Sequence, residues 1–124
     1  MDFLPKSVGK YAKNHWYVAA WSSEVADKPF ARQLMDERVV MFRDAEGKIA
    51  ALIDRCAHRL APLSMGECVN GNIRCGYHGM EYDSAGKCVN VPGQAIIPPT
   101  APPKITQYLM SDLAVWKGLV QMAF

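Results

Sequence analysis

The sequence predicts an all-β fold, and three observations support this. Short runs rich in β-branched and aromatic residues recur along the chain, no stretch shows a long helical periodicity, and turn residues separate the runs at close intervals. At 124 residues the chain is long enough for a single hydrophobic core. We therefore expect residues 1–124 to form one all-β domain.

The first half of the chain divides into strands and turns in a simple order. "HWYVAAW" (15–21) mixes aromatic and β-branched residues, and the polar stretch "SSEVADKP" ends it. "ARQLMDERVVMFRD" (31–44) predicts two strands or one bent strand. "AEGK" (45–48) then makes a hairpin turn into "KIAALID" (48–54).

The second half predicts another hairpin, a proline-rich connection and a closing segment. "MEYD", the turn "SAGK" and "KCVNV" form the hairpin over residues 80–91. Residues 91–103, "VPGQAIIPPTAPP", hold five of the 8 prolines and predict an extended surface loop, because proline cannot donate to a central strand. Residues 104–124 have a β-like composition that closes a small sheet. A helix over 105–116 is the weaker alternative, since β-branched residues and Ser-Asp interrupt it.

Composition excludes several classes of function. Lys and Arg number 14 against 12 Asp and Glu, and the basic residues are scattered, so we expect no nucleic-acid partner. No apolar run has the length of a signal peptide or a membrane span, so we expect a cytoplasmic protein without a membrane partner. In that compartment, the 4 cysteines are more typical of metal ligands or buried side chains than of a disulfide framework.

Two mixed pairs of metal-binding residues lie close together: Cys56 with His58, and Cys75 with His78, with sixteen residues between them. Three interpretations are open: ordinary core cysteines and surface histidines, a structural zinc site, and a two-iron centre. Zinc modules usually group cysteine with cysteine and histidine with histidine. A centre in which one iron takes both cysteines and the other both histidines requires one ligand of each kind from each loop, so the mixed pairs favour it.

The pattern C-x-H followed by C-x-x-H resembles the Rieske [2Fe–2S] family. "CAHRLAPLSMG" and "CGYHGMEYD" are similar to its oxygenase type, and residues 14–44 resemble the N-terminus of the vanillate demethylase, phthalate dioxygenase and dicamba monooxygenase group. The resemblance covers about Lys13 to Pro103. It implies an antiparallel β-barrel or sandwich base carrying a cluster-binding subdomain. The implied cluster-binding loops are residues 55–66, 75–83 and 91–94.

The resemblance also implies the ligands and the chemistry. Cys56 and Cys75 are expected to bind the inner iron as thiolates, and His58 and His78 the outer iron as neutral imidazoles. The cofactor is then a Rieske [2Fe–2S] cluster that transfers one electron, and electrons leave at the histidine edge. The loop containing Pro92 is expected to cover the cluster from a third side.

Four neighbours of the ligands bear on the reduction potential. Ala61 and Tyr77 stand where high-potential members carry disulfide cysteines, and Met80 stands where they carry a serine that donates to a bridging sulfide. Tyr82 falls where a tyrosine donates to a ligand sulfur. We therefore expect a potential in the lower half of roughly −150 to +300 mV.

The remaining polar candidates are weaker. Cys68 and Cys88 match no ligand position and are expected to be buried filler, and Arg59 is expected to have a surface, structural or docking role.

A mononuclear oxygenase iron needs two histidines and a carboxylate, and only His15 lies outside the two pairs. We expect no catalytic residue in this chain.

The expected function is therefore electron entry for an aromatic oxygenase or O-demethylase-like large subunit, without the mononuclear-iron catalytic domain. The expected donor is a reductase or ferredoxin, and the expected acceptor is an oxygenase catalytic domain or subunit. A free-standing Rieske ferredoxin is the alternative, and a structural zinc module is the third hypothesis.

Overall fold

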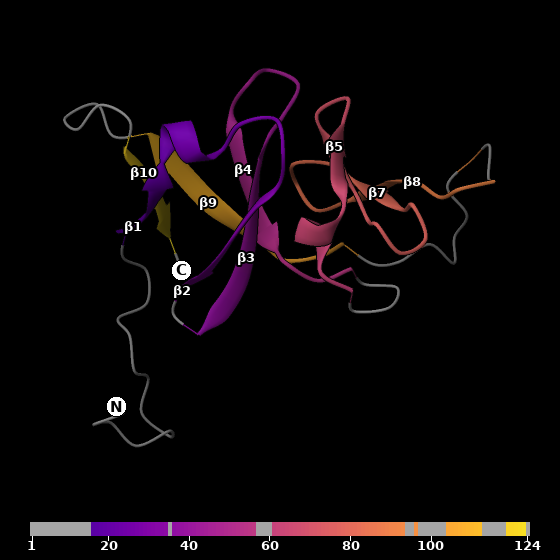
Figure 1. The fold of residues 1–124 in the computed structure, drawn as a ribbon, viewed down its shortest axis with the longest axis horizontal. Coiled ribbons are helices and arrows are strands. Elements are labelled where there is room, and N and C mark those ends of the chain that lie inside the picture. The colour runs from indigo at the N-terminus through magenta and orange to yellow at the C-terminus, as the bar shows by residue number, and fades with distance from the viewer. Residues whose placement is uncertain are drawn as a thin grey trace.

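A computed structural model describes most of the chain as two antiparallel sheets (Figure 1). The described residues are 16–34, 36–56, 61–93, 96, 104–112 and 119–123. The larger sheet has the order β1-β10-β9-β4-β3-β2. Its strands are β1 (Trp16–Trp21), β2 (Phe30–Leu34), β3 (Glu37–Arg43), β4 (Ile49–Ile53), β9 (Gln107–Asp112) and β10 (Leu119–Ala123).

The smaller sheet lies to one side of the larger one and has the order β5-β6-β7-β8 (Figure 1). Its strands are β5 (Glu67–Val69), β6 (Asn72–Arg74), β7 (Glu81–Tyr82) and β8 (Cys88–Asn90). Two 3₁₀ turns complete the described secondary structure: η1 (Ser22–Glu24) after β1, and η2 (Leu63–Met65) before β5. No helix among the described residues is long and apolar enough to cross a membrane.

The two end strands of the larger sheet are tied together by a side chain. Arg32, on β2, donates from Nη1 to the backbone carbonyl of Ala19, on β1, at 3.1 Å. Its Nη2 also pairs with Glu24, in η1, at 3.3 Å. Because β1 and β2 are the first and last strands of the sheet order, this contact holds the sheet in a curled, barrel-like form.

The continuous apolar runs of β3 and β4 reflect burial on both faces. Val39 and Met41 point into the core inside the curled sheet, whereas Val40 and Phe42 point into a second core shared with the smaller sheet. Successive strand residues point to opposite faces, so a strand between two cores has no polar positions to alternate. The second core also contains both cysteines of the predicted ligand pairs.

The structure confirms the all-β prediction and refines its elements. Residues 31–44 form two strands, β2 and β3, and the hairpin over 80–91 is β7 and β8. The closing segment forms strands β9 and β10, so the helix alternative is wrong. The structure adds a β5–β6 hairpin that the strand predictions do not include, and its turn residues Asn70 and Gly71, with φ of 51° and 80°, are a strong hairpin signal.

Candidate metal centre

The first predicted ligand loop leaves the larger sheet at the end of β4. The backbone N–H of Cys56 donates to the carbonyl of Ala61 at 2.7 Å. Below it, the Asp54 carboxylate accepts hydrogen bonds from Ser64, at 2.7 Å from the backbone N–H and 2.6 Å from the hydroxyl. The bond from Cys56 to Ala61 and the bonds from Ser64 to Asp54 both join the two ends of this segment. The Cys56 side chain is buried in the shared core.

The second predicted ligand loop follows β6 and turns back into β7. The backbone N–H of Cys75 donates to the carbonyl of Met80 at 2.7 Å, and the N–H of Gly79 donates to the carbonyl of Cys75 at 3.0 Å. Gly79 has φ +80°, a conformation that favours glycine. These bonds make a compact turn that carries His78 between a buried cysteine and a strand.

The two loops bring the Cys56 and Cys75 thiols into contact. Burial raises the pKa of the Cys75 thiol, and Cys56 raises it further, while the backbone N–H groups of Tyr77 and His78 donate to the sulfur and act in the opposite direction. Backbone N–H groups aimed at a sulfur stabilise its thiolate form. The loop therefore supplies the donors that a metal-bound thiolate needs.

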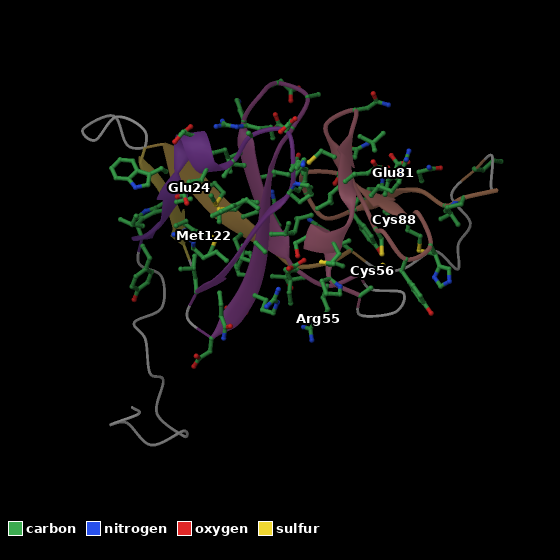
Figure 2. All side chains as sticks on the ribbon, viewed as in Figure 1. Glu24, Arg55, Cys56, Glu81, Cys88 and Met122 are labelled. Atoms are coloured by element: carbon green, nitrogen blue, oxygen red, sulfur yellow. The ribbon has the colours of Figure 1, made fainter. Side chains whose placement is uncertain are left out.

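Tyr82 provides a further polar contact to the sulfur pair. Its hydroxyl lies 3.4 Å from Sγ of Cys56, and its ring is fully buried in the shared core. At this distance the Tyr82 hydroxyl can donate a hydrogen bond to Sγ of Cys56, which is the kind of contact to a ligand sulfur that the sequence predicts. Figure 2 shows Cys56 and Cys88 on the side of the molecule that carries the smaller sheet.

His78 lies at the surface, whereas the cysteines are buried. Its imidazole packs against the Tyr77 ring, with centroids 4.1 Å apart and planes tilted by 58°. Tyr77 is itself 62% exposed. The site therefore has a buried sulfur side and an exposed imidazole side.

Glycines allow the loops to approach each other closely. A Cβ on Gly66 would lie 1.8 Å from the carbonyl oxygen of Arg74, and a Cβ on Gly76 would lie 3.0 Å from the carbonyl oxygen of Met65. A Cβ on Gly79 would lie 3.2 Å from Cγ of Pro92, so the predicted third loop packs against the second. All 4 cysteines are free, so backbone contact takes the place of a disulfide between the loops.

Some predicted residues fall outside the described part of the chain, namely His58, Arg59 and His15. Among the residues that are described, no three Cys, His, Asp or Glu side chains form a group that holds a single metal ion. Cys88 is buried in the shared core and Cys68 packs against it. Burial raises the pKa of both thiols, in agreement with the filler role expected of them.

The residues present fit an iron–sulfur cluster of mixed ligation. Such a cluster takes two thiolates on one iron and two imidazoles on the other. Cys56 and Cys75 offer two adjacent sulfurs with N–H and O–H donors, and His78 offers an imidazole three residues away on the exposed side. Assignment of the four ligands remains a prediction.

Comparison with known proteins decides the family. The family described as the Rieske [2Fe-2S] domain matches residues 15–116. The chain belongs to this family. Its cofactor is a Rieske [2Fe–2S] cluster, and its role is one-electron transfer through that cluster. Extension of the Rieske domain over the whole of residues 1–124, with the loop boundaries given above, remains a prediction.

Three relatives illustrate the similarity of this Rieske domain to oxygenase subunits. It is 52% identical over 87 residues to the putative toluene-4-sulfonate monooxygenase system iron-sulfur subunit TsaM2 of Comamonas testosteroni, covering 70% of this chain and 25% of that protein. It is 41% identical over 117 residues to the vanillate O-demethylase oxygenase subunit of Pseudomonas sp. (strain HR199 / DSM 7063), covering 91% and 32%. The crystal structure of dicamba monooxygenase bound to dicamba has a TM-score of 0.79 at 36% identity, covering 90% and 34%.

The Rieske chain thus spans between a quarter and about a third of the length of these relatives. The solved structure has the same antiparallel β architecture, which confirms the predicted fold class. Neither the zinc module nor the free-standing ferredoxin gains support from these relatives, which are named as oxygenase components.

Proposed function

We propose that this chain is the electron-entry domain of an aromatic oxygenase or O-demethylase-like large subunit. It accepts single electrons from a reductase or ferredoxin in the cytoplasm and passes them to a mononuclear-iron catalytic domain or subunit. When bound, the cluster supplies reversible one-electron chemistry. The oxygenase names of the relatives support the class of partner.

The asymmetry of the site is the observation that carries this proposal. Cys56 and Cys75 hold their sulfurs inside the shared core, away from water. His78 stands at the surface against Tyr77. The buried sulfur side would keep solvent from a bound cluster, while the exposed imidazole would hold the cluster close to a docked partner. The histidine side is therefore the side through which we propose that electrons pass.

The surface around His78 suits transient docking. Met65 is 79% exposed, and it lines a hollow of about 310 Å³ whose other lining residues are Gly66, Glu67, Arg74, Cys75, Gly76 and Gly79. Tyr77, which packs against the His78 imidazole, adds exposed apolar surface next to that ring. A small surface that mixes exposed apolar and charged side chains suits weak electron-transfer encounters, which must release the partner after each electron.

The test is spectroscopic. The protein is purified without oxygen, and visible absorption, iron, acid-labile sulfide and zinc are measured before EPR of the dithionite-reduced sample. We expect about two irons and two sulfides per chain and a Rieske-type EPR signal. A redox titration is expected to follow a one-electron Nernst curve. A colourless protein with one zinc ion contradicts the proposal.

A further inference from the structure

Asp54 is a buried carboxylate that no ligand role accounts for. It follows β4 and precedes Cys56 by two residues, and its side chain is 0% exposed. Both carboxylate oxygens are hydrogen-bonded to Ser64: Oδ1 accepts from the backbone N–H at 2.7 Å, and Oδ2 accepts from the hydroxyl at 2.6 Å. A two-point contact of this kind fixes the orientation of both residues.

The contact joins the two ends of the first ligand loop. Asp54 stands where the chain leaves β4, and Ser64 stands in η2, where the chain turns toward β5. The backbone bond from Cys56 to Ala61 lies between them. Because no disulfide ties this loop to the second one, its geometry depends on these bonds and on the glycine contacts.

Within the described residues, the Asp54 carboxylate pairs with one cation, Arg38, and that contact is weak. Nη2 of Arg38 lies 3.5 Å from Oδ2, at the outer limit of a hydrogen bond, and the Arg38 side chain is 60% exposed. An exposed, long ion pair contributes little. Inside a protein, a charge acts over a longer distance than in water, because the surrounding dielectric constant is low.

We propose that Asp54 is a positioning residue of the cluster: through Ser64 it holds the first ligand loop closed behind Cys56, and its buried charge lowers the reduction potential. This inference rests on the proposed function, because it requires a cluster to be bound. The charge effect has a definite sign. Reduction adds negative charge to the cluster, so a nearby carboxylate opposes it, and removal of the carboxylate raises the potential.

The test compares the full-length wild-type chain with three single variants and with one matched control variant. Ser64→Ala removes the hydroxyl donor and keeps the backbone N–H, whereas Ser64→Thr keeps both. Asp54→Asn removes the charge and turns an amide N–H₂ toward the donors of Ser64. Glu24→Gln is the control, because Glu24 also accepts one backbone N–H and one arginine N–H but lies on the barrel side, away from Cys56 (Figure 2).

Each protein is purified without oxygen, and three quantities are measured: the rate of iron release to a chelator, the midpoint potential, and the EPR g values of the reduced form. We expect Ser64→Ala to release iron roughly fivefold faster than wild type, the factor given by loss of one hydrogen bond. Ser64→Thr is expected to match wild type. Asp54→Asn is expected to release iron faster than Ser64→Ala, with a raised potential and altered g values, while Glu24→Gln leaves all three unchanged.

The proposal is overturned if Ser64→Ala releases iron at the wild-type rate, or if Asp54→Asn has the same potential as Glu24→Gln. If Asp54→Asn fails to fold, the comparison of Ser64→Ala with Ser64→Thr decides the positioning role. A wild-type protein without a Rieske signal contradicts the proposed function and this inference together. A wild-type signal with unaltered variants contradicts only the inference.

Discussion

The hydroxyl of Tyr82 lies 3.4 Å from Sγ of Cys56, and both side chains are buried in the core between the two sheets. The hydroxyl and the sulfur come from β7 and from the loop after β4, so the contact also joins the smaller sheet to the larger one. A thiolate that accepts this bond carries less electron density toward its iron. The bond therefore favours the reduced, more negative state.

Tyr82→Phe tests this relationship with minimal change of volume. We expect the variant to keep its cluster and to show a lower midpoint potential. A net hydrogen-bond contribution of about 1 kcal/mol corresponds to roughly 40 mV for one electron. Spectroelectrochemical titration of both proteins measures the shift. An unchanged or raised potential would show that the hydroxyl does not act on the sulfur.

His78→Ala is expected to abolish the Rieske spectrum, because His78 is the one histidine among the described residues and the substitution removes its imidazole. Cys68→Ser is the matched control: burial, and to a lesser degree the charge of Asp27, raises the pKa of the Cys68 thiol and keeps it protonated. We expect the control to retain its iron and its EPR signal. A wild-type EPR spectrum from His78→Ala would remove His78 from the ligand set.

The elements of the larger sheet could be predicted from the sequence because their patterns are local. Hairpin turns such as Asp44 to Lys48 carry their own hydrogen bonds, and the apolar runs beside them are typical of strands. The unusual continuity of the runs in β3 and β4 has a non-local cause. A strand can be apolar at every position only when a second layer covers its other face. Here that layer is the smaller sheet, whose residues come later in the chain.

The candidate site could be predicted only in part. The spacing of the two cysteine–histidine pairs indicates a metal centre, since those residue types have few other reasons to recur together. The contact between Asp54 and Ser64 gives no such signal, because aspartate and serine are common in turns and the bond spans ten residues of loop. The close approach of Gly66 to Arg74 also leaves no pattern in the sequence, because it depends on how two separate segments pack together.

Gly66→Ala tests that approach. Its Cβ would lie 1.8 Å from the backbone oxygen of Arg74, so one loop must move away from the other. We expect destabilisation of about 3 kcal/mol or more, with loss of iron. Gly47→Ala is the control, because Gly47 has φ +79° but nothing within 4 Å of its Cβ position, so only the left-handed backbone contributes, at about 1–2 kcal/mol. Urea denaturation measures both. Equal losses would mean that the loops tolerate a wider separation.

The pH dependence of stability is expected to report on Tyr108. Its hydroxyl donates to Oε1 of Glu37 at 3.0 Å, linking β9 to the start of β3. Burial first, and then this bond and the Glu37 charge, raise the pKa of Tyr108 well above its usual value of about 10. The folded protein therefore holds this proton more tightly than the unfolded chain. The resulting stability is fully present below about pH 10 and is lost as the pH rises toward the folded-state pKa.

Between pH 9 and 11, the free energy of unfolding of the wild type is thus expected to fall more steeply than that of Tyr108→Phe, by at most about 1.4 kcal/mol per pH unit. Tyr77→Phe, which removes the hydroxyl of an exposed tyrosine between β6 and β7, is the control and is expected to follow the wild-type curve. Chemical denaturation at each pH gives the three curves. If the Tyr108→Phe curve runs parallel to the wild type, the proton on Tyr108 is held no more tightly in the folded protein than in the unfolded chain.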